Sequence, residues 1–263
     1  MAGEELKILF VADVVGQPGR EAVRALLPAL KKELRPDLTI LNGENSAGGF
    51  GLTAKLVSEL RGYGADVITT GNHVFAQKEF VGELPNLDRV LRPANYPPGA
   101  PGQGWCALEA AGHRVLVMNL IGRIFLDPLD DPFRTADAIL QAHPDTRVVF
   151  CDMHAEATSE KTAMGWYLDG RASAVVGTHT HIPTADARVL PGGTAYVTDV
   201  GMVGPRDSCI GMDKDVVIKR FLTGVPNRFV VASGPVTFNS VLVTINPSTG
   251  QATSIQRVDR EHV

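Results

Sequence analysis

The sequence predicts an α/β protein arranged as a four-layer α/β/β/α sandwich, in which two mixed sheets pack face to face and helices flank them. Apolar runs of strand length alternate with helical patterns at the start of the chain, which favours parallel strand pairing. Later in the chain, apolar runs separated by turn sequences predict antiparallel hairpins. Because β-α-β units and hairpins occur together, two packed sheets are favoured over a single doubly wound sheet.

The first part of the chain predicts three buried strands and two helices. Residues 7–12 form a continuous apolar run of strand length, and residues 38–42 and 67–70 repeat this signal. Residues 53–60 predict a capped amphipathic helix. The other helix follows the first strand, and its apolar face carries Val23, Leu26, Leu27, Leu30 and Leu34. This order of elements predicts β-α-β units.

The middle of the chain is less regular. Residues 90–111 hold several prolines and glycines, and we interpret this segment as a loop excursion. Residues 114–119 and 147–152 resume the buried-strand pattern on either side of a helix predicted at 132–142. Residues 175–177 predict one more short strand.

Two hairpins are predicted downstream. Residues 187–189 and 195–198 flank a Pro-Gly-Gly turn, and residues 236–245 and 253–258 flank Pro-Ser-Thr-Gly. No internal repeat, low-complexity tract or linker interrupts the chain. We therefore expect one domain over residues 1–263, a length at which one α/β domain can bury a full-sized core.

The composition limits the class of protein. The 25 Lys and Arg residues are outnumbered by 29 Asp and Glu residues, so the net charge of -4 gives no strong nucleic-acid signal. The three cysteines do not form a disulfide pattern, which favours a reducing compartment. The N-terminal residues do not resemble a signal peptide, and no apolar run reaches the roughly 18 residues that a membrane span needs. We expect a soluble, cytoplasmic protein without membrane partners.

Polar residues follow the predicted strands at the points where those strands end. Ligands of open α/β folds bind in the crevice beyond the carboxyl ends of the strands. Five strand ends therefore direct oxygen and nitrogen atoms toward one rim. The residues at these positions are Asp13, Glu44, Asn45, Asn72, His73, His154, His179 and His181.

This mixture of side chains predicts a particular chemistry. Carboxylate, amide oxygen and imidazole suit divalent iron, manganese or zinc, whereas a soft thiolate site would need cysteines. A carboxylate such as Glu44, placed between two clusters, can bridge two ions. Two neighbouring ions can hold both the attacking and the leaving oxygen of a phosphoester. The pattern therefore predicts phosphoryl transfer rather than acyl transfer.

Some of these residues also have a purely structural interpretation. Asp13 could cap the helix that follows it. Asn72 could be a turn residue beside Gly71, and Asn45 could cap the loop that precedes Thr53. Cys151 adjoins a strand end, but no base is assigned to it, and we interpret it as a small buried hydrophobe.

The motifs of this rim resemble those of a known family. D-V-V-G, N-G-E-N, G-N-H, Asp152-Met153-His154 and G-T-H-T-H occur in the order and spacing of the calcineurin-like metallophosphoesterases, and more narrowly of their YmdB-like branch. The resemblance extends from residue 7 to about residue 258. Val15, Glu44 and Val74 depart from the broader superfamily pattern but are similar to the YmdB-like branch.

The resemblance implies a role for each residue of the rim. One metal ion would be held by Asp13, Asn45 and His181, the other by Asn72, His154 and His179, with Glu44 as the bridge. His73 would be the catalytic residue, either as a general acid or as a cation over the developing phosphorane charge. The cofactors would be two divalent or mixed-valence transition-metal ions, with iron first and manganese or zinc as alternatives.

The resemblance also implies the reaction. A metal-bound hydroxide would attack a phosphodiester without a covalent intermediate, and cyclic nucleotides such as 2′,3′-cyclic AMP would be the substrate class. A phosphomonoesterase or nucleotidase is the nearest alternative. A regulatory nucleotide-sensing or RNA-associated module with low turnover is another. The small-molecule phosphoester would be the main partner, and the resemblance allows a homo-oligomer.

Overall fold

A computed structural model describes residues 5–263 of the chain. Its first sheet has six strands. The last four strands of the spatial order given below are parallel to one another, and each of the first two is antiparallel to the strand that follows it. In spatial order these strands are β15 (Ala252–Arg257), β14 (Ser240–Ile245), β1 (Leu6–Val11), β3 (Leu38–Asn42), β4 (Val67–Thr69) and β5 (Val90–Leu91). The N-terminal strand therefore lies beside a strand from the C-terminal part of the chain.

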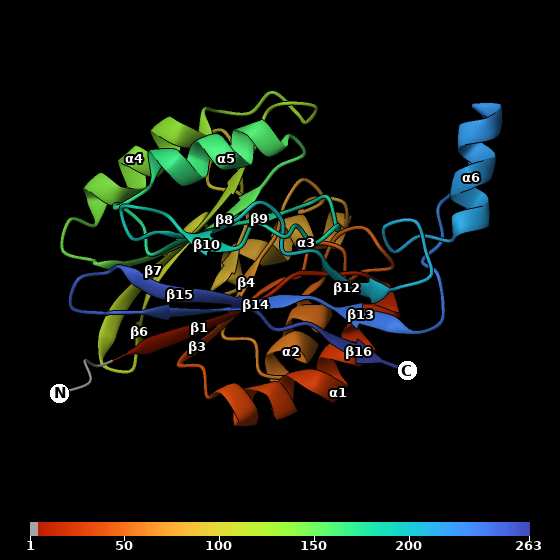
Figure 1. Ribbon diagram of the computed structural model, residues 1–263. Coiled ribbons are helices and arrows are strands. Elements are labelled where there is room, and N and C mark those ends of the chain that lie inside the picture. Colours follow the sequence, from red (N-terminus) through yellow and green to blue (C-terminus); the bar gives the residue numbers. More distant parts are fainter. Residues whose placement is uncertain (1–4) are drawn as a thin grey trace.

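A second sheet of six strands packs against the first (Figure 1). Its inner strands are parallel, and an antiparallel strand closes each edge. In spatial order they are β10 (Arg188–Val189), β11 (Ala195–Val197), β9 (Ala174–Thr178), β8 (Val148–His154), β7 (His113–Ile121) and β6 (Trp105–Ala110).

Strand alternation produces the core between the sheets. In β1, Ile8 and Phe10 point into the inter-sheet cluster, whereas Leu9 and Val11 pack on the helical side. Phe10 stacks on Phe150 of β8 with 5.5 Å between ring centroids. One face of each of these strands is covered by the other sheet and the opposite face by helices, so both faces are apolar. This is why the strands are continuous apolar runs in the sequence.

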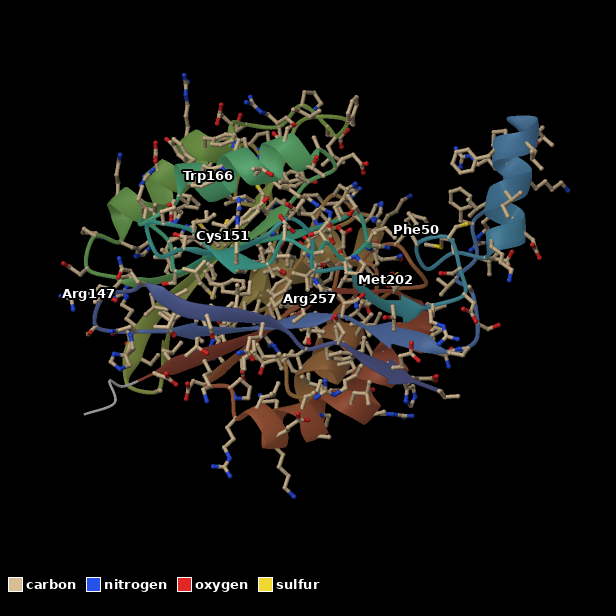
Figure 2. The ribbon with its side chains drawn as sticks, viewed as in Figure 1. Phe50, Arg147, Cys151, Trp166, Met202 and Arg257 are labelled. Atoms are coloured by element: carbon tan, nitrogen blue, oxygen red, sulfur yellow. The ribbon has the colours of Figure 1, made fainter. Side chains whose placement is uncertain are left out.

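Helices cover the outer face of each sheet (Figure 1). The helices α1 (Gly16–Leu34), α2 (Ala54–Gly62) and α3 (Lys78–Glu83) pack on the first sheet. The helices α4 (Pro132–Ala142) and α5 (Thr158–Tyr167) pack on the second. Cys151 is fully buried beneath this second layer (Figure 2). The predicted four-layer fold is confirmed.

Helix caps explain why two helices begin where the sequence placed them. The hydroxyl of Thr53 accepts a hydrogen bond from the backbone N–H of Leu56 at 3.3 Å, which starts α2. The carboxylate of Asp131 accepts from the N–H groups of Phe133 and Arg134, and Pro132 occupies the first turn of α4.

A small third sheet was not predicted. It consists of β16 (Arg260–His262), β13 (Val236–Phe238), β12 (Met202–Pro205) and β2 (Asp13–Val14). Strands of two to four residues are too short to give a periodic signal. The sheet matters because β2 pairs with β12 and so fixes the position of Asp13.

Two expectations were wrong in detail. The segment at residues 90–111, interpreted as a loop, contains β5 and β6 at its ends, and only the part between these strands is a loop. The β6 strand forms an edge with alternating exposure, so its apolar signal is weak. The predicted strand at residues 236–245 is divided at Asn239 into β13 and β14, which belong to different sheets.

The remaining α-helix of the described residues, α6 (Lys214–Thr223), stands apart from the layered body (Figure 1). Within residues 5–263, no helix combines the length and apolar character needed to cross a bilayer.

Candidate metal centre

The structure brings all the predicted site residues into one cluster at the carboxyl ends of the strands. Asp13 lies in β2, His154 ends β8, and the others follow β3, β4 and β9. Direct contacts link the members into a continuous network. The set is Asp13, Glu44, Asn45, Asn72, His73, His154, His179 and His181.

The ring of His154 lies at the centre of this network. Its Nε2 is 2.9 Å from Asn72 Oδ1, 3.1 Å from His179 Nδ1 and 3.2 Å from Glu44 Oε1. One nitrogen carries at most one proton and cannot hydrogen-bond to three acceptors equally well. Ligand atoms of Glu44, His154 and His179 all lie within 4.8 Å of one another. Such a convergence of lone pairs suits a cation.

In His154 and His181 the outer nitrogen, Nδ1, has an acceptor that fixes the tautomer of the neutral ring. The Thr178 hydroxyl donates to Asp152 Oδ1 at 2.7 Å, so it can accept the Nδ1 proton of His154 at 2.9 Å. His181 Nδ1 donates to the carbonyl of Ile210 at 2.8 Å. In the neutral form of both rings the lone pair is therefore on Nε2, which faces the cluster. Outer partners of this kind orient histidines that bind metals.

His179 has the opposite orientation. Its Nε2 is 3.1 Å from the carboxylate of Glu156, so its Nδ1 directs a lone pair inward. Burial and the nearby charge of His154 lower the pKa of His179 to about 3, which keeps the ring neutral and able to act as a ligand.

Asn45 joins the two sides of the cluster. Its Nδ2 lies 3.1 Å from Glu44 Oε1 and 3.1 Å from His181 Nε2. Its Oδ1 is 2.8 Å from Nδ1 of His73, which is partly exposed at the edge of the cluster. Glu44 and Asn45 therefore lie between the His154 side and the His181 side.

The charges of the cluster favour a bound cation. Burial raises the pKa of Glu44, but His154 and His73 outweigh this effect and hold it well below its usual value. Burial lowers the pKa of His154, but the charge of Glu44 outweighs it and raises the pKa to about 9. The centre thus attracts positive charge.

Two further features fit a metal ion. Asp13 is fully buried, and among the described residues its Oδ1 has no hydrogen-bond partner. Burial raises the pKa of Asp13 well above its usual value. A Cβ added at Gly71 would collide with His154 Nε2 and Glu44 Oε2, so the cluster uses the space that glycine leaves. A buried carboxylate oxygen that has no hydrogen-bond partner and lies among other possible metal ligands is suited to bind a metal ion.

Two residues that support the cluster were missed by sequence reasoning. Asp199 accepts hydrogen bonds from the N–H and hydroxyl of Thr180, which lies between the two histidines of the last motif. Lys161 in α5 donates to Asp199 at 2.6 Å. Asp199 comes shortly after β11, so the strand-end signal could have identified it. Lys161 has no such local signal.

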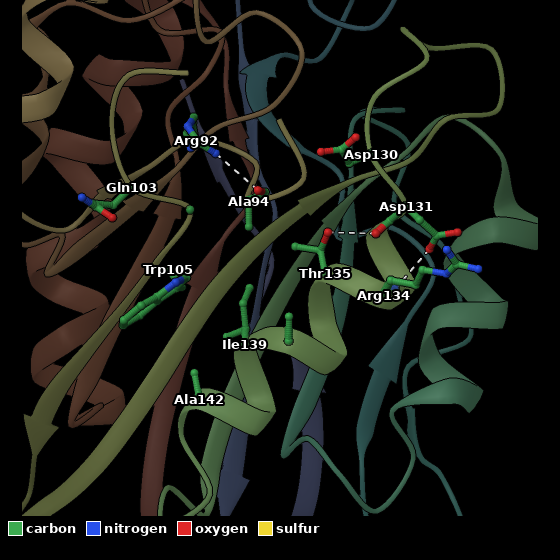
Figure 3. Close-up of a pocket in the computed structure, with 12 residues that line it drawn as sticks. Arg92, Ala94, Gln103, Trp105, Asp130, Asp131, Arg134, Thr135, Ile139 and Ala142 are labelled. Atoms are coloured by element: carbon green, nitrogen blue, oxygen red, sulfur yellow. Dashed lines mark hydrogen bonds between the residues drawn. The ribbon is translucent and has the colours of Figure 1, made fainter. Parts of the chain in front are cut away.

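A cavity beside α4 is separate from this cluster. It has a volume of about 570 Å³ and lies between α4 and the loop that precedes β6 (Figure 3). Arg92, Trp105, Asp131 and Arg134 are among its lining residues, but no member of the cluster lines it.

Comparison with known proteins identifies the family. Residues 9–258 match the family of YmdB-like proteins. A 2′,3′-cyclic-nucleotide 2′-phosphodiesterase of Bacillus subtilis (strain 168) is 53% identical over 257 residues, which cover 96% of each chain. The crystal structure of a hypothetical protein from Thermus thermophilus is 45% identical, with a TM-score of 0.93 over 98% of this chain and 100% of the other.

A crystal structure of a phosphatase from Mycoplasma pneumoniae is 32% identical, with a TM-score of 0.94 over 98% of this chain and 94% of the other. The resemblance that the motifs indicated is confirmed along nearly the whole chain. This protein belongs to the YmdB-like family.

Proposed function

We propose that this protein is a metal-dependent phosphodiesterase that hydrolyses cyclic nucleotides of the 2′,3′-cyclic AMP class. The observation that carries the proposal is a set of three imidazoles whose outer nitrogens have partners. The inner nitrogens of His154 and His179 lie beside the buried carboxylate of Glu44, and that of His181 lies beside the amide of Asn45. The name of the Bacillus subtilis relative supports this substrate class.

The cluster divides naturally into two metal sites. Asp13, Asn45 and His181 would hold one ion, and Asn72, His154 and His179 the other. Glu44 would bridge them, because it lies between the two sets of ligands. Its Oε1 is 3.1 Å from Asn45 Nδ2 on one side and 3.2 Å from His154 Nε2 on the other. When bound, two such ions polarise the phosphoryl oxygens and activate water for attack.

The contacts of His73 support a role as proton donor. Its Nδ1 faces Asn45 Oδ1 at 2.8 Å, which leaves Nε2 directed away from that contact. The backbone N–H of His73 donates to Glu44 Oε2 at 3.2 Å, so the residue is attached to the cluster without being buried in it. We propose that His73 donates a proton to the ribose oxygen as its bond to phosphorus breaks.

The nature of the ions is also a proposal. Carboxylate, amide and imidazole ligands accept iron, manganese and zinc, and we propose iron as the native metal, in divalent or mixed-valence form. We propose a cytoplasmic location, since Cys106, Cys151 and Cys209 are all unpaired, as expected in a reducing compartment. We further propose that residues 1–263 form a single domain.

Self-association through α6 would explain its exposed apolar side chains. Phe221 is 84% exposed and Leu222 is 81% exposed on a helix that stands apart from the body (Figure 1). Asp213 and Asp215 lie at its N-terminal end, and Arg220 lies near its C-terminal end. An antiparallel pair of α6 helices from two copies would bring these opposite charges together. Phe221→Glu should then reduce the sedimentation coefficient, whereas Phe125→Glu, at another exposed phenylalanine, should not.

One experiment tests the proposed function. Metal content is measured by elemental analysis on protein purified without chelator, together with hydrolysis of 2′,3′-cyclic AMP and of AMP. We expect about two ions per chain and turnover of the cyclic diester. Turnover of AMP alone would favour a phosphomonoesterase. Nucleotide binding without turnover of either compound would favour a sensor, and a protein that takes up no metal would refute the mechanism.

A further inference from the structure

Two exposed apolar side chains flank the metal cluster on rigid turns. Phe50 is 37% exposed and follows the N-G-E-N motif, and Ile210 is 49% exposed in the loop before α6. Single exposed apolar residues are common and need no functional explanation. These two differ because each is attached to a member of the cluster and is held there by backbone geometry.

Phe50 lies against the proposed proton donor. Its ring meets the ring of His73 edge to face, with 5.0 Å between centroids. The turn that carries it is closed by hydrogen bonds from Ala47 N to Gly51 O at 2.9 Å and from Gln77 Nε2 to Phe50 O at 2.7 Å. These hydrogen bonds hold the turn that carries the ring beside His73.

Ile210 is attached to the opposite side. Its carbonyl accepts the Nδ1 proton of His181 at 2.8 Å. Ile210 and Gly211 form the two-residue turn between Cys209 and Met212, with φ values of 49° and 97°. Turns with two positive φ angles favour Asn-Gly, and a β-branched residue rarely adopts this conformation. Isoleucine is thus unfavourable for the backbone conformation of this turn, which indicates that its side chain has another role.

The two turns pack against each other. A Cβ at Gly49 would lie 2.7 Å from Cε of Met212, so the Phe50 turn rests on the residue that follows the Ile210 turn. The chain of contacts from His73 through Asn45 to His181 connects the same two turns beneath. Phe50 and Ile210 therefore belong to one rim above the metal cluster.

We infer that Phe50 and Ile210 form an apolar platform that binds the nucleobase of the cyclic nucleotide. This inference rests on the proposed function. A purine presents a flat apolar face, and stacking on an aromatic ring is a common way to hold a base without reading its sequence. With the base on this platform, the cyclic phosphate would lie toward His73 and the metal ligands.

The test compares a substrate that has a base with one that lacks it. Steady-state hydrolysis of 2′,3′-cyclic AMP and of ribose 2′,3′-cyclic phosphate is measured for the wild type, Phe50→Ala and Phe50→Tyr. Phe50→Ala should raise KM for 2′,3′-cyclic AMP about tenfold, as expected for the loss of one stacking contact, with a much smaller effect on the abasic compound. Phe50→Tyr should restore the wild-type KM. Trp166→Ala, which removes a half-exposed aromatic from α5, should change neither.

Ile210→Asn gives an independent readout. Asparagine suits a positive φ, so this variant should unfold at a higher temperature than the wild type. It should nevertheless raise KM for 2′,3′-cyclic AMP severalfold. A more stable protein that binds substrate less well cannot be explained by damage to the fold.

Three results would overturn the inference. The first is an equal loss of kcat on both substrates in Phe50→Ala, which would mean that Phe50 only positions His73. The second is an unchanged KM in both variants. If the wild type hydrolyses neither compound, the proposed function fails instead, and calorimetric titration with adenosine 3′-monophosphate then tests the platform alone. In that titration, weaker binding by Phe50→Ala supports the platform, and equal binding is the third overturning result.

Discussion

Lys161 and Asp199 form an ion pair of 2.6 Å in which both side chains are about 1% exposed. Asp199 Oδ2 also accepts the N–H of Thr180 at 3.1 Å and its hydroxyl at 2.8 Å. The pair thereby fixes the segment that carries His179 and His181, both of which have positive φ angles. A buried charge pair behind two proposed metal ligands acts through geometry rather than through contact with substrate.

Removal of one partner should be costly. Lys161→Met leaves the carboxylate of Asp199 buried without a counter-charge, which should lower the free energy of unfolding by about 3–5 kcal/mol. Urea denaturation measures this value. The double variant Lys161→Met/Asp199→Asn removes both charges and should recover much of the loss. A single variant as stable as the wild type would show that the pair has no structural role.

Glu44→Gln should reduce the amount of bound metal. The bridge between two cations loses its negative charge, so elemental analysis should find clearly fewer than about two ions per chain. Glu160→Gln is the matched control, because Glu160 is a buried carboxylate that accepts hydrogen bonds from the backbone of Arg123, outside the cluster. Equal metal content in both variants would disprove the bridging role.

His73→Ala should separate metal binding from proton transfer. The variant should keep its metal, since no metal role is assigned to this ring. Hydrolysis of 2′,3′-cyclic AMP should fall by about 100-fold or more, the usual contribution of a general acid. Hydrolysis of bis(p-nitrophenyl) phosphate, whose leaving group needs no proton, should fall far less. The same loss on both substrates would argue against the acid role.

Gly71→Ala tests the crowding of the centre. The added methyl group would meet His154 Nε2 and Glu44 Oε2, so metal binding and activity should both be lost. Gly82→Ala introduces the same group into α3, where nothing lies within 4 Å, and should keep both properties. Elemental analysis and an activity assay on the two folded variants measure the difference. A Gly71→Ala variant with full metal content would contradict the geometry of the site.

Asp186 should contribute to acid sensitivity. Burial raises its pKa, but hydrogen bonds from Thr184 and Thr198 outweigh this and place the pKa below its usual value. Its stabilising contribution is complete above the ordinary pKa of about 3.9 and is lost as the pH falls through the lower folded-state pKa. Between about pH 5 and pH 2, the stability of Asp186→Asn should therefore fall less steeply than that of the wild type. Parallel denaturation curves over this range would exclude the contribution.

The sequence was most informative where one strand ended in one conspicuous polar residue. Asp13, Asn72 and His154 could be assigned to one rim because parallel strands bring their carboxyl ends to the same edge. The structure unites them with Glu44 and His179 in one network. The metal roles of these residues stay predictions, of which Glu44→Gln tests the bridge directly.

Features that depend on distant contacts could not be predicted in this way. Lys161 is an ordinary helical lysine in the sequence, and only the fold brings it to Asp199, 38 positions later. The two-residue strand β2 exists because β12 offers a partner for Asp13. The fixed orientation of Thr180 likewise depends on Asp199, which no local pattern connects to the histidines.

The pairing of β1 with β14 affects how the protein is made. Residues 6–11 leave the ribosome long before their antiparallel neighbour at residues 240–245, because more than two hundred residues separate the two strands. Until then one side of β1 is an open hydrogen-bonding edge, a feature that promotes aggregation of nascent chains. Truncated translation products should accordingly depend on chaperones and be removed by proteases rather than accumulate as partly folded enzyme.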